Sequence, residues 1–415
     1  MPQNWAQNYT YAAPRIVTAN SVDDVRAALA EPGPVHALGT RHSFTDVPDT
    51  PGTLIDVTGL EGPAVIDAEA GTARVTAGTR YAVVAEQLHH SGFALHNMGS
   101  LPHINVGGAT QTATHGSGDA RGVLSTAVRS LRYVDASGEL REVSRGDADF
   151  PALVVGVGAF GVIVDLDLEI EPDYLVRQDV YHGLTWDALL ANVDAVTGAG
   201  DSVSLFSRWD EAPGPLWVKR RVAGAEVAAA DAILDAVRSP ENVSPLGMGD
   251  NITELGTAGP WYLRLPHFRA DSEPSRGDEI QSEYFVDRAH AAAALAAVRE
   301  IADGFREHLI VTEVRTAAAD ELWLSPAYQR DSVIIHFTWE NRDAEVRAAL
   351  VDIEAALAPF DARPHWGKLH LFDRERLEAV VPRLADARAV YERIDPEGRF
   401  VNAHLVVRVG LRTPR

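Results

Sequence analysis

The chain has 415 residues, and its 37 Lys and Arg against 59 Asp and Glu give a net charge of −22 at pH 7. Such a negative charge repels nucleic acids and anionic membranes, so we expect neither as a partner. The chain has no cysteine, which excludes disulfides, thiolate metal sites, cysteine nucleophiles and a flavin linked through cysteine.

The length exceeds what one ordinary hydrophobic core requires and predicts two domains. The N-terminal residues MPQNWAQNYTYAAPRIV lack the basic start and apolar run of a signal peptide. The longest apolar stretch, residues 150–164, is too short and too rich in glycine for a membrane span of ~20 residues. We expect a soluble cytoplasmic protein, and the negative charge suits a monomer.

The first part of the chain alternates short strands with short helices. Ser21 and Asp24 have the spacing of a capping box at the start of an apolar helical stripe. Residues 74–77 have the pattern of a strand. After this strand, Thr79 is expected to cap a helix that ends before Gly92, where a helix C-terminus favours glycine.

Two glycine-rich segments in this part could hold an anion. In ALGTRHSF, residues 37–44, Gly39 allows close backbone approach and His42 follows, although a surface turn with an ordinary histidine fits too. NMGSLPHINVGGATQTATHGSG, residues 97–118, is a long loop without acidic side chains, as a phosphate site requires, or simply a structural loop. Its candidate ligands are Ser100, Gly107, Gly108, Thr110, Thr112, Thr114, Gly116 and Ser117.

The segment VVGVGAFGVIVDLDLEIEP, residues 154–172, contains the G-x-G-x-x-G fingerprint of dinucleotide-binding Rossmann turns at Gly156, Gly158 and Gly161. A Rossmann site needs a helix after the glycines. Instead, apolar and acidic residues alternate with the period of a strand, which Pro172 ends. We therefore expect no NAD site here, and we expect the acidic residues on the solvent side of the strand.

The middle of the chain predicts an α+β arrangement, in which helices cover an antiparallel sheet. Alanine-rich helices are expected over residues 225–237, 288–303 and 344–357, and strands over residues 281–286, 309–316 and 332–339. The final segment DPEGRFVNAHL has turn chemistry followed by a strand-like end.

Two of these strands carry polar residues on one face. Glu313 and Arg315 lie two apart, as do His336 and Thr338, whereas apolar residues alternate with the second pair. A carboxylate, a guanidinium and a hydroxyl are the groups that hold a polyol. A solvated sheet face with a surface ion pair is the alternative. Lys368 adds a cation, or is a surface lysine whose stem packs on apolar groups.

Several catalytic classes have no motif in the chain. It lacks H-E-x-x-H and any Cys/His cluster, so we expect no metal. It also lacks the G-x-S-x-G elbow of serine hydrolases and the G-x-x-x-x-G-K-[ST] phosphate loop.

Taken together, the three glycine-rich segments resemble the flavin-binding segments of the vanillyl-alcohol-oxidase-type (PCMH-type) flavoproteins. The chain is most similar to the bacterial alditol oxidases (xylitol or sorbitol oxidases), and the similarity runs in order along nearly the whole chain. It also includes NWAQN, QSEY, the strands within residues 313–339, LSPAYQRD, RPHWGK and DPEGRFVNAHL. The resemblance implies a two-domain α+β fold. Residues 1–174 would bind FAD, residues 175–370 would form an antiparallel-sheet cap that binds substrate, and residues 371–415 would return to the FAD domain.

The resemblance further implies FAD linked covalently through His42 to the flavin 8α-methyl group. The implied cofactor contacts are Gly39, Thr40, Arg41, His42, Ser43, Phe44, Ser100, Gly107, Gly108, Thr110, Thr114, His115, Gly116, Ser117, Gly161 and Ile163. The implied substrate contacts are Ser100, Glu313, Arg315, His336, Thr338 and Lys368.

The implied reaction oxidises the terminal primary alcohol of an alditol by hydride transfer to flavin N5, and O2 is reduced to H2O2. Arg315 and Lys368 would stabilise the developing alkoxide. His336 would accept the proton, and Glu313 would hold a neighbouring hydroxyl.

The sequence departs from the family pattern at Thr40 and Arg41, where we expect smaller residues, which leaves the tuning of the flavin open. Gly99 stands where the wider family also has alanine, and the missing methyl group should favour O2 access and an oxidase over a dehydrogenase. The nearest alternative is an aldonolactone oxidase or dehydrogenase of the same fold. A sugar-binding protein that has lost its flavin is a further alternative, which the intact loops, His42 and Lys368 disfavour.

Overall fold

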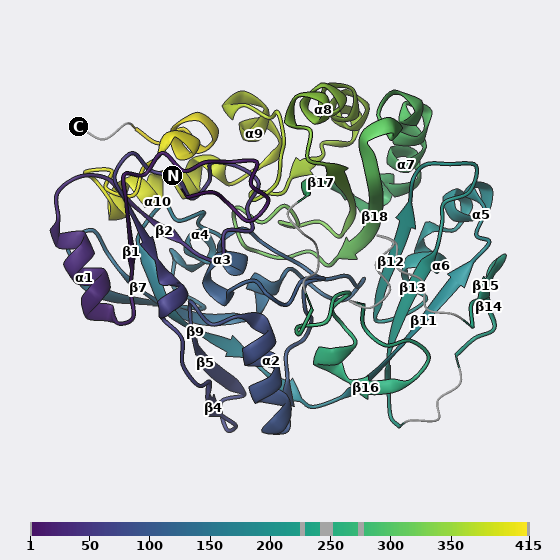
Figure 1. The fold of residues 1–415 in the computed structure, drawn as a ribbon, viewed down its shortest axis with the longest axis horizontal. Coiled ribbons are helices and arrows are strands. Elements are labelled where there is room, and N and C mark those ends of the chain that lie inside the picture. The colour runs from purple at the N-terminus through teal and green to yellow at the C-terminus, as the bar shows by residue number, and fades with distance from the viewer. Residues whose placement is uncertain (1, 225–228, 241–251, 273–277, 413–415) are drawn as a thin grey trace.

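The computed structural model describes residues 2–412 apart from 225–228, 241–251 and 273–277. Its two largest sheets come from different parts of the chain, one from residues 65–169 and one from residues 175–364 (Figure 1). In the described part of the chain, no helix is long and apolar enough to cross a membrane.

The first strands form a small parallel sheet with the order β1-β3-β2. Its elements are β1 (Arg15–Thr18), α1 (Val22–Ala30), β2 (Val35–Leu38) and β3 (Thr53–Asp56). The Ser21 hydroxyl accepts the N–H of Asp24, and the Asp24 carboxylate accepts the N–H of Asn20. These bonds use free donors at the start of α1, so the predicted helix start is confirmed.

The second sheet has five antiparallel strands in the order β4-β5-β9-β7-β8. They are β4 (Val65–Asp67), β5 (Thr72–Thr76), β7 (Val128–Val134), β8 (Leu140–Ser144) and β9 (Val162–Glu169). The accompanying elements are α2 (Tyr81–His90), β6 (Phe93–Ala94), α3 (Val106–Gln111), α4 (Phe150–Leu153) and β10 (Glu171–Pro172).

The predicted strand after the G-x-G-x-x-G pattern is confirmed as β9, but its acidic face does not simply meet solvent. Arg132 binds Asp165 through two nitrogens, and Arg74 donates to Asp167 at 2.7 and 2.9 Å. Neighbouring strands β5 and β7 supply these arginines. The acidic alternation therefore pairs charges across the sheet.

The third sheet has the order β14-β15-β11-β13-β12-β18-β19-β17-β20, and β16 pairs with β11. Every strand pair given for this sheet is antiparallel. Its strands are β11 (Leu175–His182), β12 (Ser202–Ser207), β13 (Leu216–Val222), β14 (Ala232–Ile233), β15 (Ala236–Arg238), β16 (Ala258–Pro260), β17 (Glu279–Asp287), β18 (Leu309–Ala317), β19 (Ser332–Glu340) and β20 (Arg363–Pro364).

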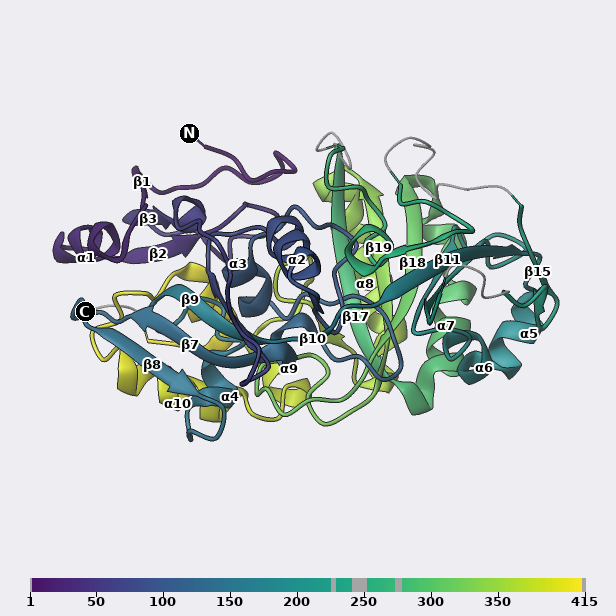
Figure 2. The same cartoon turned by 90° about the horizontal axis from the view of Figure 1, so that it is seen from below.

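Helices cover one face of this sheet (Figure 2). They are α5 (Trp186–Ala191), α6 (Val193–Thr197), α7 (Ala291–Glu300) and α8 (Asp343–Leu357). On β19 the predicted apolar face is buried toward them, and Phe337 stacks on Trp339 with ring centroids 5.3 Å apart. The opposite face carries the polar residues, and segments that follow β5 and α2 in the chain contact it.

The last residues contact the first part of the chain. They form α9 (Arg374–Val380), α10 (Leu384–Ile394) and a helical turn at residues 405–409. The Tyr391 hydroxyl donates to the carbonyl of Ala152 at 2.6 Å, and the Asn402 amide donates to the carbonyl of Val47 at 2.9 Å. The predicted strand-like end is wrong, because this turn packs its apolar residues against α9.

Three other local predictions were wrong. The Thr79 hydroxyl bonds with the Thr76 hydroxyl instead of capping α2. The predicted loop 97–118 contains α3. Where a helix over residues 225–237 was predicted, residues 232–233 and 236–238 form β14 and β15, because pairing with β11 overrides the helix propensity of alanine. Residues 225–228 of that prediction lie outside the described part.

Candidate active site

A cavity lies between the glycine-rich segments of the first part and the polar face of the large sheet. The expected cofactor residues in its wall are Gly39, Thr40, Arg41, His42, Ser43, Phe44, Ser100, Gly107, Gly108, Thr114, His115, Gly161 and Ile163. All six expected substrate residues also line it: Ser100, Glu313, Arg315, His336, Thr338 and Lys368. The fold therefore brings together groups that are far apart in sequence.

Three expected cofactor residues lie outside the cavity wall. The Thr110 hydroxyl donates to carbonyls within α3, and the Ser117 hydroxyl donates to the carbonyl of Val203 on β12. A Cβ atom at Gly116 would lie 2.3 Å from the carbonyl oxygen of Met98. These residues hold the loop in place rather than face the cavity.

His42 meets the requirements of a covalent flavin link. Its Nδ1 is buried and has no hydrogen-bond partner in the described part of the chain, and its ring lies 5.0 Å from that of Trp5. Burial, with a smaller effect of His103, lowers the pKa of His42 to about 3. The imidazole is therefore neutral at pH 7, with a nitrogen lone pair available for bond formation.

The loop that carries His42 fits against α3 through Asn105. The Asn105 side chain accepts the N–H of Thr40 at 3.0 Å and donates to the carbonyl of Ala77 at 2.8 Å. A Cβ atom at Gly39 would lie 2.3 Å from Asn105 Oδ1, so only glycine fits there. Arg41 adopts φ 65° and donates to Asp56 at 3.0 Å. The larger residue at Arg41 is thus used in an ion pair that fixes the loop.

The wall suits a flavin dinucleotide. Among its described residues, the acidic side chains Glu279 and Glu313 lie on the sheet, so none competes with a phosphate on the side of the glycine-rich segments. Gly158 and Gly161 line the cavity, and a Cβ at Gly161 would lie 2.6 Å from the Tyr133 ring. Two of the three glycines of the fingerprint therefore line the cavity without forming a Rossmann turn, and Gly161 also allows close packing on β7.

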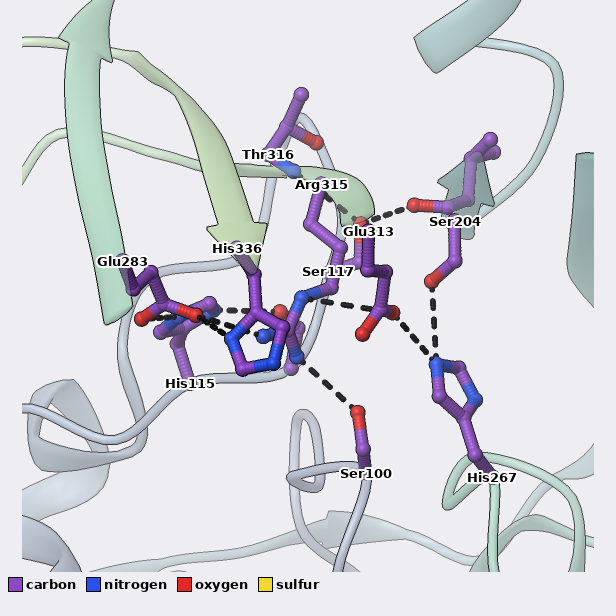
Figure 3. Close-up of polar contacts among 12 residues, drawn as sticks. Ser100, His115, Ser117, Ser204, His267, Glu283, Glu313, Arg315, Thr316 and His336 are labelled. Carbon is purple, nitrogen blue, oxygen red and sulfur yellow. Dashed lines mark hydrogen bonds and ion pairs between the residues drawn. The ribbon is translucent and has the colours of Figure 1, made fainter. Parts of the chain in front are cut away.

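Glu283, on β17, is the centre of the polar cluster on the sheet, and it was not among the predicted site residues. It is fully buried, and four basic side chains surround its carboxylate, of which Figure 3 labels His115, Arg315 and His336. The distances to its oxygens are 2.9 Å from His115 Nε2, 2.8 Å from His336 Nδ1, 3.0 Å from Arg315 and 2.8 Å from Lys368 Nζ. The motif QSEY contained a signal, because Glu283 is an acidic residue directly before the apolar run of residues 284–286.

Charge outweighs burial at Glu283. Burial by itself would raise the pKa of this carboxyl, but Lys368 and His115 hold the pKa well below its ordinary value. Burial lowers the pKa of Lys368, which the Glu283 carboxylate counteracts. The cluster therefore keeps an ionised carboxylate under two cationic side chains, Arg315 and Lys368, at the cavity wall.

His336, on β19, lies directly opposite Glu283 on the neighbouring strand β17. The register aligns Glu283 with His336 and His336 with Glu313, so all three side chains lie on one face. Burial and the charge of Lys368 lower the pKa of His336 to about 4, so the ring is neutral at pH 7. Its Nε2 lies 3.1 Å from the Thr338 hydroxyl, and its Nδ1 lies 2.7 Å from Lys368 Nζ.

Glu313 and Arg315 form the other end of the polar face. Both are buried, which contradicts the alternative of a surface ion pair. Arg315 Nε lies 3.5 Å from Glu313 Oε1, and Arg315 also donates to the Ser100 hydroxyl at 3.1 Å (Figure 3). The flavin-side loop and the sheet are thus joined at the cavity.

Lys368 reaches the site from a short loop after β20. The N–H of Phe44 donates to the carbonyl of Gly367 at 2.8 Å, which fixes this loop against the segment that carries His42. Lys368 is therefore a buried member of the cluster and not a surface lysine. Gly99 also lines the cavity, and a Cβ atom there would lie 3.6 Å from its nearest neighbours, so a methyl group would fit.

Two family models match the two parts of the chain that line opposite sides of the cavity. Residues 13–144 match the family described as FAD binding domain. Residues 276–408 match the family described as D-arabinono-1,4-lactone oxidase. The first match includes the His42 loop, and the second includes Glu283, Glu313, His336 and Lys368.

Full-length relatives are enzymes. The chain is 41% identical over 409 residues to the alditol oxidase of Streptomyces sp. (strain IKD472), with 97% of each chain covered. It is 30% identical over 424 residues to the L-gulono-1,4-lactone dehydrogenase of Mycobacterium tuberculosis, with 96% of each covered. The fold is similar to that of cholesterol oxidase from B. sterolicum, with a TM-score of 0.78, 15% identity and coverage of 97% and 95%.

Proposed function

The chain belongs to the alditol oxidase family of FAD-dependent oxidoreductases, and we propose on this premise that it oxidises the terminal primary alcohol of a sugar alcohol to the aldose. The fold is of the vanillyl-alcohol-oxidase type. We also propose the division into an FAD-binding domain (1–174), a cap (175–370) and a returning C-terminal segment (371–415), which the separate sheets support.

One observation carries the proposal. A buried cluster of Glu283, Arg315, His336 and Lys368 lies on the sheet side of a cavity. Its other side carries the neutral His42 ring, whose Nδ1 has no hydrogen-bond partner among the described residues. Cations beside a neutral imidazole suit the removal of an alcohol proton, and His42 suits a covalently held flavin.

His42 would hold FAD through its ring, and the segments at residues 37–44, 99–115 and 157–163 would surround the cofactor. When bound, FAD supplies the redox chemistry: it accepts a hydride from the alcohol carbon and passes two electrons to O2, which yields H2O2. The room beside Gly99 favours access of O2 and therefore an oxidase.

Arg315 and Lys368 stabilise the negative charge that develops on the substrate oxygen. Glu283 fixes both cations, because Arg315 donates to it at 3.0 Å and Lys368 at 2.8 Å. Fixed cations in a buried site act strongly, since no water has to reorganise around them during the reaction. Removal of the alcohol proton therefore becomes easier near neutral pH.

His336 accepts the alcohol proton at Nε2. This role needs the tautomer in which Nδ1–H donates to Glu283, 2.8 Å away, and Nε2 faces the Thr338 hydroxyl and the cavity. The carboxylate then stabilises the imidazolium once Nε2 is protonated. Because the pKa of His336 is lowered to about 4, the ring is available as an acceptor across the neutral range.

Glu313 binds a hydroxyl next to the reacting carbon, and Ser100 and Thr338 bind further oxygens of the polyol. Glu313 is ionised, because Arg315 and His267 hold its pKa well below its ordinary value against the effect of burial. An ionised carboxylate accepts hydroxyl hydrogens strongly and fixes the position of the substrate.

The test is steady-state peroxide production with xylitol and with a sugar-acid lactone. Peroxide from xylitol supports alditol oxidation, whereas turnover of the lactone alone supports an aldonolactone enzyme, to which the match over residues 276–408 also points. A colourless purified protein would instead support a sugar-binding protein without flavin. A screen of alditols then gives the preferred substrate.

The cytoplasmic location and the monomeric state remain predictions. The net charge of −22 supports the monomeric state. Cell fractionation and size-exclusion chromatography test them.

A further inference from the structure

Three polar side chains form a row of hydrogen-bonding contacts from the interior of the large sheet to the substrate side of the cavity. Lys219, on β13, is 1% exposed, although lysine is rarely buried. Its Nζ lies 3.0 Å from Nδ1 of His267, whose Nε2 lies 2.6 Å from Glu313 Oε1 (Figure 3 shows the second contact). The proposed reaction uses Glu313 but neither of the other two.

The contacts of Glu313 and Lys219 together fix which nitrogen of His267 carries a proton. A lysine ammonium has three N–H donors and no acceptor. The neighbours of Lys219 Nζ are the carbonyl oxygens of Leu265 and Pro266 and the His267 ring nitrogen. Burial lowers the pKa of Lys219 to about 7, so the carboxylate at the other end of the ring decides the tautomer. Ionised Glu313 can only accept, so Nε2 of His267 carries the proton and Nδ1 faces Lys219 as an acceptor. His267 therefore donates its Nε2–H to Glu313.

The ring of His267 is also held in place. Phe206 and Trp217 pack edge-on against it, with centroids 5.6 and 5.1 Å away. Its backbone N–H donates to the carbonyl of Ser100 at 3.0 Å, which ties the segment to the flavin-side loop. A donor with both orientation and protonation fixed can set the position of the carboxylate it binds.

One oxygen of Glu313 is left for substrate. His267 and Arg315 both contact Oε1, at 2.6 and 3.5 Å. Among the described residues no hydrogen bond is made to Oε2, and Glu313 lines the cavity. We propose that Lys219 and His267 are positioning residues that hold Glu313 as the acceptor for a C2 hydroxyl, and that they set the preference for polyols. This inference rests on the proposed function, in which Glu313 binds that hydroxyl.

The test compares glycerol with 1,3-propanediol in the flavin-loaded enzyme. The two differ only in the C2 hydroxyl, and both ends of each molecule have the same connectivity. Lys219→Met removes the ammonium at similar length. His267→Asn places an amide near the Nδ1 position and leaves Glu313 without its donor. Both should lower kcat/KM for glycerol by about ten-fold or more, the effect of one hydrogen bond to a charged group. The value for 1,3-propanediol should not change.

Two matched variants should keep the wild-type ratio of kcat/KM for glycerol to kcat/KM for 1,3-propanediol. His267→Gln places an amide N–H near the Nε2 position and preserves the donor to Glu313. Ser204→Ala removes only the longer contact of 3.3 Å to the same nitrogen. Covalent flavin content and melting temperature show that each variant is folded.

A wild-type ratio in both Lys219→Met and His267→Asn would overturn the inference, provided that Glu313→Gln abolishes the preference for glycerol. An unchanged ratio in Glu313→Gln would overturn it as well, because Glu313 would then not read the hydroxyl. A wild-type enzyme that oxidises a lactone but no polyol would contradict the proposed function itself.

Discussion

Glu283 binds four basic side chains with one carboxylate, and this residue explains why the site can hold two cations inside the protein. Without the carboxylate, Lys368 would lose its proton more readily, because burial already lowers its pKa. His336 would also lose the acceptor for its Nδ1–H. The substrate-facing residues therefore depend on a group that lies behind them.

Glu283→Gln should consequently lower kcat/KM for an alditol by about 10²-fold or more, the usual effect of losing a preorganised electrostatic contact. The control is Glu354→Gln. Glu354 is also buried and binds Arg376 and the Tyr284 hydroxyl, but it does not line the cavity. This control should lower the melting temperature and leave kcat/KM of the folded enzyme unchanged. Equal kinetic losses in the two variants would contradict the role of Glu283.

At His42 the structure predicts where the flavin is attached. His42→Ala removes the only proposed point of covalent attachment, so acid precipitation should release the flavin into the supernatant. In the wild type and in the exposed-residue control His90→Ala, the colour should stay with the precipitate. Retention of the colour in His42→Ala would place the link on another residue.

At the scale of elements, the sheet positions the site because its other face is packed by helices. Leu350 on α8 is fully buried, whereas its neighbour Val351 is 57% exposed. Leu350→Ala should therefore lower the free energy of unfolding by about 2–5 kcal/mol, through the cavity it creates. Val351→Ala should have little effect. Denaturant titration of both variants measures this, and similar losses would show that α8 is not docked as described.

The same elements show what the sequence could predict. Strict alternation identified β9, β18 and β19, and with them Glu313, Arg315, His336 and Thr338 on one face. Alternation does not say which polar residues of separate strands meet. The roles of Glu283 and His267 follow from strand register and from the loop at residues 264–268 that folds back onto the sheet. The alanine-rich residues 229–238 became strands because a sheet edge was available, which local propensity does not contain.

At the scale of the whole molecule, buried neutral histidines make stability depend on pH. Burial lowers the pKa of His36, His267 and His336 from 6.5 to about 4. Between these values the unfolded chain binds more protons than the folded one, so stability rises with pH and is lost on acidification. Asp320 has the opposite effect on stability. Burial raises its pKa to about 6, so the folded chain binds one proton there that the unfolded chain has lost.

The net effect is a melting temperature that falls as the pH is lowered from about 6.5 to about 4.5, since each net proton changes the free energy of unfolding by about 1.4 kcal/mol per pH unit. Scanning calorimetry across this range, in buffers of equal ionic strength, measures the slope. A melting temperature that is constant or rises on acidification would show that these histidines are protonated in the folded protein.

Anaerobic mixing of the purified protein with xylitol, followed by addition of O2, tests the central claim most directly. Xylitol should bleach the yellow absorbance of the bound flavin, and O2 should restore it rapidly with one H2O2 formed per flavin. A sugar-acid lactone should leave the absorbance unchanged. Bleaching by the lactone and not by xylitol would contradict the account.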